Sequence, residues 1–383
     1  MTIATGVNKL LTFKKQAGLG VVAGASGGQN LRRTQSTLDL KKATYSSKEL
    51  RPSQQIADMR HGVRSVEGTI SGELSVGTYQ SFIESVLRRA ATGTTTFDST
   101  GGAVTGNIIT VTGDKTGQTA KVGTVVAAAG VNYLIAKCTT AQSILVRLDG
   151  GTAVAGTMTE VGKHTYVPQT GQTRDYYTIE HNFQDIVQAE RFTDCMITQM
   201  DVKLPASGMA GVDFMVKGLN VVTGTTGYFT SPVAATSGSV LAAANGVLTL
   251  AGAPIALITG MNFSIKGGHT TIGGVVGSNV EPDIFPGNVE ADGQVTVLFQ
   301  DATMRDIFIN ETEVSIVAAF TGSNAANAPF VSICFPRVKL GGAQKDDGEK
   351  GLVMTMPFTA LEALPTDTGS YQTTVFIQDS AFV

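Results

Sequence analysis

The stretch that decides the fold is VRSVEGTISGEL, Val63 to Leu74, because its pattern returns as NVEADGQVTVLF, Asn288 to Phe299, at a shift of 288 − 63 = 225 positions. The same shift places the whole of 38–83 on 263–308 without a gap. The aligned apolar pairs are Leu38/Phe263, Leu40/Ile265, Met59/Ile284, Ile70/Val295, Leu74/Phe299, Phe82/Ile307 and Ile83/Phe308, and the identical pairs are Gly62/Gly287, Gly68/Gly293, Asp58/Asp283 and Thr78/Thr303. So long a period exceeds that of solenoids and propellers, so it predicts duplication of a whole domain.

Each copy has the same order of predicted elements: a strand, a long loop, a second strand and a short helix. Alternating apolar residues predict the strands, and apolar residues at helical spacing predict the helices. The expected ranges are 34–44, 63–75 and a helix 79–89 capped by Thr78 in the first copy, against 258–265, 289–299 and a helix 302–310 opened by Asp301 in the second. Three more strands are expected after each helix, over 176–183, 195–204 and 212–216, and over 314–320, 331–340 and 352–358. The fold class is therefore mainly β.

About 80 extra residues separate the helix of the first copy from its third strand. They are rich in Gly, Thr and Val, which predicts an inserted small β-barrel, because insertion at a surface loop disturbs the host least. The expected organisation is an N-terminal arm at 1–33, a discontinuous first unit at 34–90 and 173–220, the insertion at 91–172, a linker at 221–257 and a second unit at 258–383. We also align Val202 to Leu204 with Val338 to Leu340 as equivalent strand ends.

Charged residues make up only 15% of the chain, and Gly reaches 45 residues. A surface with so few charges indicates contact with other subunits. The net charge of −3 argues against tight binding of nucleic acid, which needs clustered Lys and Arg. From residue 225 onward there are 6 Lys/Arg against 14 Asp/Glu, which leaves 22 against 17 before it, so the halves carry −8 and +5. Either an electrostatically complementary head and tail or a basic outer loop accounts for this imbalance.

Cys138, Cys195 and Cys334 are odd in number and far apart, so they indicate neither a disulfide framework nor a zinc site. A reducing compartment fits this cysteine usage best. The N-terminal residues lack a signal-peptide pattern, and no apolar run approaches the ~18 residues of a membrane helix. We therefore expect a chain that is made and kept in the cytosol, with no membrane partner.

No motif in the chain predicts catalysis, a cofactor or a metal site. Gly24 to Gly28 matches G-x-S-x-G, and Gly18 to Gly24 imitates a dinucleotide loop, but neither has the required strand before it and helix after it. Glu180 and His181 alternate on a strand and so cannot share a metal, and we expect a solvated strand face there. The acidic run 346–349 lacks the spacing of a calcium loop, so we interpret it as an exposed loop.

Carboxylates also occur at regular places on the predicted strands. In the strand around Ile70, the residues Glu67 and Glu73 point away from the apolar face. Asp292 repeats the position of Glu67, and Asp201 alternates in the same sense. An ordinary wet sheet face and a functional acidic face explain this pattern equally well.

The arm, the repeated unit and the stretches 64–75 and 79–89 together resemble the major tail tube proteins of long, non-contractile-tailed, siphovirus-like phages. The resemblance covers the two repeats and implies a β-sandwich or barrel unit with a short flanking helix, and no enzyme activity. It further implies that six units close a ring, that rings stack, and that the inner sheets line a DNA channel. A chain with two such units would then need three copies per ring, as a pseudo-hexameric trimer.

The resemblance also implies roles for particular residues. Carboxylates lining the channel would repel phosphate and let DNA slide without specific binding. The lumen-lining candidates are Glu67, Glu73, Asp201 and Asp292, and the inter-ring candidates, on the arm and on the loops 45–62 and 267–286, are Leu10, Leu11, Phe13, Lys48, Arg51 and Asp283. The implied partners are the chain itself and the tape measure, terminator and distal tail proteins, and the implied location is the virion tail.

The insertion leaves a second interpretation open. A β-rich phage adhesin or capsid-decoration protein would use the inserted domain to bind a host surface. It would exist as a discrete monomer or trimer and would not grow along an axis.

Overall fold

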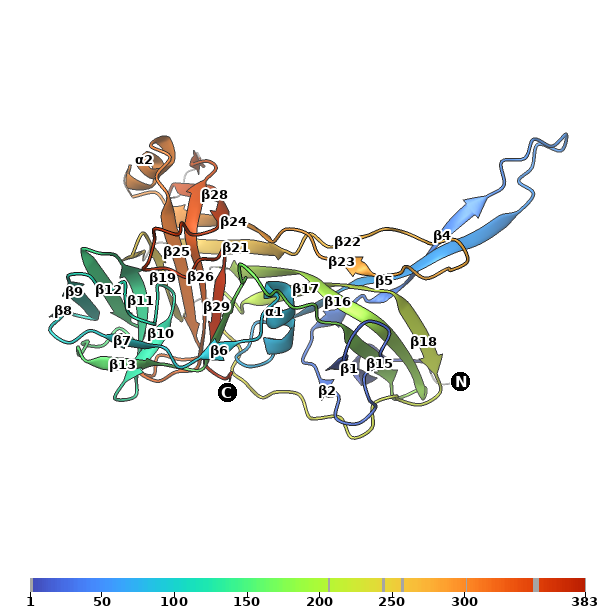
Figure 1. Cartoon of the computed structure of the whole chain (residues 1–383), viewed down its shortest axis with the longest axis horizontal. Helices are drawn as coiled ribbons and strands as arrows, with labels where there is room; N and C mark the ends of the chain where they lie inside the picture. Colours follow the sequence, from blue (N-terminus) through green and yellow to red (C-terminus); the bar gives the residue numbers. More distant parts are fainter. Residues whose placement is uncertain are drawn as a thin grey trace.

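The computed structural model describes residues 3–205, 207–242, 245–255, 258–300, 302–346 and 351–382. Within these residues the chain is mainly β, with the two short helices α1 (Gln80–Leu87) and α2 (Thr303–Ile309) and the 3₁₀ turn η1 (Gly6–Asn8). Figure 1 shows a large antiparallel sheet, a curled smaller sheet on one flank and a long hairpin that projects from the other end.

The strands of the large sheet fall into two sets that follow the two halves of the chain. The first set is β1 (Lys9–Lys15), β2 (Gln29–Asn30), β3 (Gln35–Ser36), β4 (Asp39–Ser46), β5 (Met59–Glu73), β15 (Tyr177–Phe183), β16 (Gln188–Pro205), β17 (Gly211–Gly218) and β18 (Asn220–Gly224). The second set is β19 (Gly246–Leu250), β20 (Ala253–Pro254), β21 (Ile258–Lys266), β24 (Glu290–Leu298), β25 (Val314–Thr321), β26 (Phe330–Leu340), β27 (Gln344–Lys345), β28 (Val353–Leu361) and β29 (Phe376–Asp379). The strands β22 (Thr270–Thr271) and β23 (Ile284–Phe285) form a separate two-stranded sheet in the long loop of the second half.

The two halves have the same pairing order. Neighbouring strands run β4, β5, β17, β16, β15, β1 in the first half and β21, β24, β28, β26, β25, β19 in the second. The register agrees as well, because Leu40 lies opposite Val66, and Ile265 lies opposite Ala291, the same pair after a shift of 225. The shift of 225 positions seen in the sequence therefore also relates the strand pairs of the first half to those of the second half.

The core follows the alternation of the strands. Val66 and Ile70 of β5 and Leu74, which follows it, are buried in the same core cluster as the apolar residues of helix α1. Phe82 of α1 is fully buried, and its ring packs against those of Phe13 and Phe214 at centroid distances of 4.9 and 5.3 Å. This helix therefore covers the sheet with the apolar face that the sequence pattern predicts.

The repeated glycines Gly68 and Gly293 have the same structural role in each half. A Cβ on Gly68 would lie 2.4 Å from Cα of Leu38, and a Cβ on Gly293 would lie 2.8 Å from Cβ of Phe263, the residue equivalent to Leu38. Both positions therefore require a residue without a side chain, because the neighbouring strand approaches too closely for any other.

We predict that Gly68→Ala and Gly293→Ala each destabilise the protein by about 1–3 kcal/mol, because the added methyl group forces the adjacent backbone to shift. Gly117→Ala is the matched control, since a Cβ there meets nothing within 4 Å. Denaturant unfolding followed by circular dichroism measures the difference. A control as destabilised as the two variants would contradict this explanation.

The segment expected to be an arm is part of the sheet. β1 pairs with β15 over seven residue pairs, from Lys9 opposite Phe183 to Lys15 opposite Tyr177. Leu11 and Phe13 are only 2% and 6% exposed and belong to the main core. The sequence interpretation missed this strand because its apolar run is short and is followed by a Gly-rich stretch.

We predict that Phe13→Ala costs about 3–5 kcal/mol in unfolding free energy, as expected for a buried aromatic residue. Leu10→Ala, at a half-buried position of the same strand, should cost clearly less. Thermal and urea unfolding of both variants test this expectation. Equal effects at the two positions would show that β1 does not pack as described.

The inserted residues form a seven-stranded antiparallel sheet that is curled but not closed. Its order is β7 (Thr96–Asp98), β13 (Thr157–Glu160), β10 (Val125–Ala128), β11 (Val131–Cys138), β12 (Gln142–Arg147), β9 (Ile108–Thr112) and β8 (Ala103–Thr105). β7 and β8 stand at the two ends of this order, so the expected small β-barrel is present in part, as a curled half-barrel sheet. Two further strands of the insertion, β6 (Thr92–Gly93) and β14 (Lys163–Tyr166), join the large sheet beside β29.

The insertion shares a core with the second half of the chain. Phe97 and Leu134 of the inserted sheet belong to the same buried cluster as Val317, Cys334 and Phe376 of β25, β26 and β29. The inserted sheet therefore packs as a second layer on these strands.

Candidate functional site

A row of polar side chains crosses the middle of the large sheet. Asp213 lies opposite Asp201, Asp201 opposite Ser264, and Ser264 opposite Asp292. Directly opposed residues in antiparallel strands share a face, so this row runs along one surface from the first half of the chain into the second. The neighbours Met200 and Ile265 point to the other face and are buried in the core.

The four lumen-lining candidates lie on this same face. Glu67 and Glu73 alternate with the buried Val66, Ile70 and Leu74, and they lie opposite Lys217 and Gly211 of β17. Lys217 and Gly211 are an even number of residues away from Asp213, so they lie on the same face of β17 as Asp213. Both glutamates therefore belong to the polar face. The structure thus brings together Glu67, Glu73, Asp201 and Asp292, which come from the three strands β5, β16 and β24.

The carboxylates of the face are largely paired. Lys41 Nζ lies 2.9 Å from Glu67, Lys203 Nζ 3.0 Å from Asp213, and Lys266 Nζ 2.8 Å from Asp292. The hydrogen bond from Lys266 to Asp292 raises the pKa of Lys266, and Asp213 does the same for Lys203. Asp201 accepts hydrogen bonds from Gln199 Nε2 at 2.8 Å and from Ser264 Oγ.

The face therefore carries a modest negative charge. Over strands β4, β5, β17, β16, β21 and β24, its carboxylates are Asp39, Glu67, Glu73, Asp201, Asp213, Glu290 and Asp292, and its ammonium groups are Lys41, Lys203, Lys217 and Lys266, giving 4 − 7 = −3. The face continues over β28 and β26, where Lys339 lies opposite Thr359. Each lysine that pairs with a carboxylate is less available to a phosphate. This surface repels a polyanion weakly and has no cluster of free cations to hold one.

A single long strand joins the two halves of this face. The C-terminal part of β16 pairs with β17 on one side and with β21 on the other, from Gln199 opposite Lys266 to Pro205 opposite Gly260. Side chains reinforce the joint: Arg88 donates to the carbonyl oxygens of Gly287, at 2.7 Å, and of Gly267. Arg88 can make these bonds because it ends α1 in the left-handed conformation, at φ 58°.

The long loop of the second half folds onto this joint. Asp283 accepts a hydrogen bond from the Tyr176 hydroxyl at 2.7 Å and pairs with Arg174 at 3.2 Å. His269 is 8% exposed in the same loop, where burial and the nearby Arg88 guanidinium lower its pKa to about 4. A buried neutral imidazole thus forms part of the contact between the halves.

We predict that acid loosens this joint through His269. Its folded pKa lies below the usual value of about 6.5, so the stabilisation is complete above pH 6.5 and is lost as the pH falls toward 4, by up to about 3 kcal/mol. His269→Gln should flatten this dependence in urea unfolding at pH 7, 5.5 and 4.5.

The quantity to compare is the change of the unfolding free energy with pH in the wild type and in His269→Gln. Burial raises the pKa of Asp379 to about 6, which contributes the opposite slope between pH 4 and 6 in both proteins. If the two unfolding curves shift in parallel with pH, His269 does not titrate in this way.

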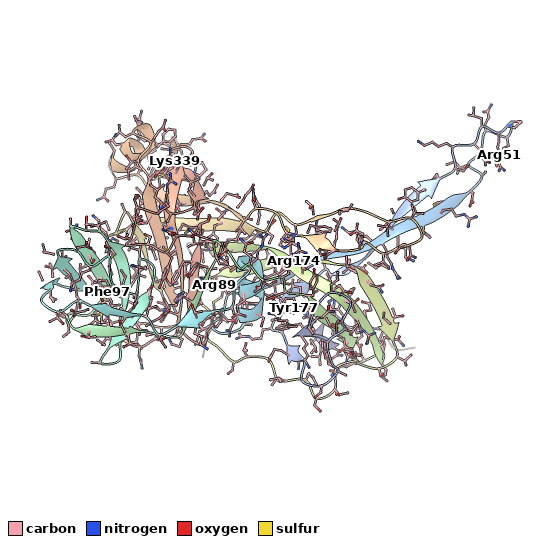
Figure 2. All side chains as sticks on the ribbon, in the orientation of Figure 1. Arg51, Arg89, Phe97, Arg174, Tyr177 and Lys339 are labelled. Atoms are coloured by element: carbon pink, nitrogen blue, oxygen red, sulfur yellow. The ribbon has the colours of Figure 1, made fainter. Side chains whose placement is uncertain are left out.

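The first-half loop protrudes into solvent as a long hairpin. β4 and β5 pair beyond the body of the sheet, from Leu40 opposite Val66 out to Ser46 opposite Met59, and Arg51 lies near the tip (Figure 2). Leu50 and Ile56 are 101% and 75% exposed. The base of the hairpin contacts the second-half loop through the Arg64 N–H, which donates to the carbonyl of Asn279 at 2.9 Å.

The six inter-ring candidates therefore occupy different environments. Lys48 and Arg51 are exposed near the tip of the hairpin, and Arg51 pairs with Glu49 at 2.8 Å. Asp283 lies within the joint between the halves. Leu10 is half-buried, and Leu11 and Phe13 lie in the core, so these apolar side chains already contact their own chain.

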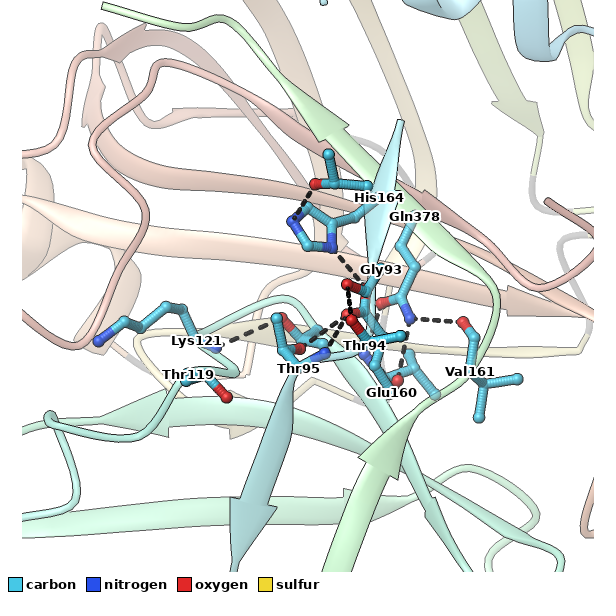
Figure 3. A network of polar contacts seen from close by, with 12 residues as sticks. Gly93, Thr94, Thr95, Thr119, Lys121, Glu160, Val161, His164 and Gln378 are labelled. Atoms are coloured by element: carbon cyan, nitrogen blue, oxygen red, sulfur yellow. Dashed lines mark hydrogen bonds and ion pairs between the residues drawn. The ribbon is translucent and has the colours of Figure 1, made fainter. Parts of the chain in front are cut away.

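Two buried polar clusters were not expected from the sequence. Glu160 Oε1 lies 2.5 Å from Nδ1 of His164, and its other oxygen accepts from Thr95 Oγ1 at 2.7 Å. Gln378 of β29 bonds the carbonyl of Val161 beside this pair at 2.8 Å, so the cluster fastens the insertion to the second half (Figure 3). Only the i, i+4 spacing of Glu160 and His164 hinted at such a pair.

Glu180 and His181 form the second cluster. They are both 1% exposed, so the expected solvated strand face is wrong. Glu180 accepts the backbone N–H groups of Tyr228 and Phe229, and the ring of His181 bonds Ser36 Oγ at 3.0 Å. Both residues therefore hold the segment after β18 and the N-terminal strands against β15.

The sequence motifs form no catalytic or metal arrangement. Ser26 of the G-x-S-x-G match makes an isolated bridge to Thr230, and no helix follows it. In the described part of the chain, no three His, Cys, Asp or Glu side chains gather as metal ligands. Of the acidic run 346–349, residues 347–349 lie outside the described residues, as does Asp301. None of the described helices is long and apolar enough to cross a membrane.

The described residues form an extended sheet with one polar face and open strand edges, the architecture of a β protein that can pair with further strands. Residues 6–365 match the family model described as phage tail tube protein, so the chain belongs to this family. It is a structural, non-enzymatic subunit of the phage tail tube in the virion tail, and family membership implies that it polymerises with itself and meets other tail proteins. No curated protein matches the chain.

Proposed function

We propose that the chain carries two tube-type units and that three copies close a pseudo-hexameric ring of a long, non-contractile tail. The observation that carries this proposal is the agreement of strand order and register between the two halves. Each half supplies the same set of sheet strands and one short helix, so each can occupy one of six similar positions. The in-chain joint between β16 and β21 is then one of the six lateral contacts of the ring.

In such a ring the polar face lines the lumen. The face is continuous across both halves, and its opposite side is the buried core, so it is an extended polar surface of the large sheet. Over strands β4, β5, β17, β16, β21 and β24, three copies would contribute about 3 × (−3) = −9 charges. A weak, largely paired negative lining lets DNA pass into the host without holding it.

The insertion would then lie on the outside of the tube. On β25, the residues Ile316 and Ala318 face the main core, while Val317 and Ala319 face the inserted sheet. The inserted sheet therefore covers the side of these strands that faces away from the main core. We assign residues 91–172 to this outer layer and keep adhesion to a host surface as its possible added role.

Ring stacking would rest on the β4–β5 hairpin. Its exposed apolar tip needs a partner, because contiguous exposed apolar side chains mark contact sites. The equivalent second-half loop is held in the joint by Arg88 and Tyr176. Each ring would thus offer three protruding hairpins rather than six. The ends of the tube would meet the tape measure, terminator and distal tail proteins, after assembly in the host cytoplasm.

We predict that shortening the hairpin separates ring formation from stacking. Ser46 lies opposite Met59, so an Asn-Gly turn can replace residues 47–58 without disturbing the paired strands. Negative-stain electron microscopy and sedimentation should show tubes for the full chain and single rings for the shortened one.

Leu50→Ser with Ile56→Ser is the milder companion variant and should weaken stacking without abolishing rings. Tubes of unchanged length from the shortened chain would exclude the hairpin from stacking. If the full chain remains globular and discrete at high concentration, the proposed self-driven assembly of rings and tubes fails.

A further inference from the structure

The contact between the two halves of the chain is a backbone ladder with a known register. Asp201 of β16 lies opposite Ser264 of β21, and Met200 lies opposite Ile265. On the polar side, Ser264 Oγ donates to Asp201, and on the core side Met200 and Ile265 are 1% and 0% exposed. The chain therefore contains one complete example of how two of its units join.

The strands that would make the next joint can be identified from the register. β4 is equivalent to β21 by the shift of 225, which maps Ser264 onto position 264 − 225 = 39. β26 is equivalent to β16 by a shift of 143. In β16, Cys195 lies opposite Tyr177 and Phe192 lies opposite Ile179, with one irregularity in the pairing between them. In β26, Val338 lies opposite Val314 and Phe335 lies opposite Ile316, with the same irregularity between them.

The same shift extends into β27. It maps Asp201 onto position 201 + 143 = 344, and Gln344 does lie opposite Thr355 of β28, as Asp201 lies opposite Asp213 of β17. β27 is therefore the continuation of β26, and Gln344 occupies the position of Asp201.

Both of these strands have an open edge. Among the described residues, β4 pairs only with β5, and β27 pairs only with β28. The N–H of Leu40 donates to the side chain of its own neighbour Asp39, at 2.7 Å, in place of a backbone partner. Leu40 and Ala343 are half-buried at the margin of the main core, whereas their in-chain equivalents Ile265 and Met200 are fully covered.

We propose that residues 342–346 of one copy pair antiparallel with residues 37–41 of a second copy, with Gln344 opposite Asp39 and Ala343 opposite Leu40. The proposal rests on the ring described above and names the strands and register that close it. The Gln344 amide donates to the Asp39 carboxylate where Ser264 donates to Asp201 in the chain. Ala343 and Leu40 cover each other as Met200 and Ile265 do. Because the two edges differ, the contact is head to tail and can close a ring.

A disulfide cross-link tests this register. Directly opposed residues in antiparallel strands have Cα atoms about 4.5–5.5 Å apart, which a disulfide can bridge. Asp39→Cys with Gln344→Cys in the full-length protein should therefore give, on mild oxidation of concentrated protein, a covalent ladder of two and three copies that ends at three. The native Cys138, Cys195 and Cys334 are all buried and contribute little background.

Two matched pairs control the experiment. Asp201→Cys with Ser264→Cys should close within one chain, because it reproduces the in-chain joint. Asp39→Cys with Thr355→Cys moves one cysteine a single strand further on the same face, to a Cα separation of about 10 Å, beyond the ~7 Å limit for a disulfide. This second pair should not cross-link.

The outcomes separate this inference from the proposed function. Tubes or rings in the microscope without a cross-link at 39/344 overturn the register and leave the tube function standing. Equal yields at 39/344 and 39/355 also overturn it. A protein that stays monomeric while the 201/264 control forms overturns both proposals, and a ladder that runs past three copies keeps the joint but excludes the trimer.

Discussion

The structure depends on the two-sided pairing of β16. Its N-terminal part pairs with β15 and β18, and its C-terminal part pairs with β17 and β21. The N-terminal part of β16 therefore pairs only within the first half, while its C-terminal part contributes to the polar face that the two halves share. Because both edges of its C-terminal part are occupied, the two halves cannot separate without breaking a backbone ladder, and unpaired buried backbone groups are costly.

The pairing of β16 on both sides explains why the polar face is continuous and why its net charge is small. Strands from both halves bring Asp201, Ser264 and Asp292 into one row, so carboxylates accumulate where the strands meet. Lysines on the same strands, such as Lys203 and Lys266, offset them at distances near 3 Å. Exposed pairs of this kind add little stability, and in the proposed tube their main effect would be on the electrostatic field that passing DNA meets.

Much of the first part of each half could be predicted from the sequence. The shift of 225 is visible because Gly68 and Gly293 both face a close backbone approach and because β4, β5 and α1 contain no insertions relative to β21, β24 and α2. The later strands follow different shifts, since the insertion and the irregularities in pairing intervene. The alignment of Val202 with Val338 is therefore wrong by seven positions, because the register maps 202 onto 202 + 143 = 345.

Other parts could not be predicted because they depend on partners distant in the chain. β1 and β19 contain only short apolar runs, and each becomes a strand by pairing with β15 or β25. The four carboxylates were found from alternation alone, but the lysines that pair with them lie on other strands, so only the register reveals them. Likewise, nothing in the loop 267–286 shows that Asp283 bonds Tyr176.

In the proposed ring, a covalent duplication would permit an asymmetry that six separate subunits cannot have. Arg88 and Tyr176 hold the long loop of the second half, while the equivalent loop of the first half extends as a free hairpin. In a ring of identical single units, every loop would face the same environment and would have to serve both joints. In the proposed ring, one loop would stabilise the contact between units, and the other would remain available for a neighbouring ring. The inserted layer is likewise confined to one half, where it shares the core of β25, β26 and β29. The repeat thus keeps the sheet nearly symmetric while its loops and outer layer diverge.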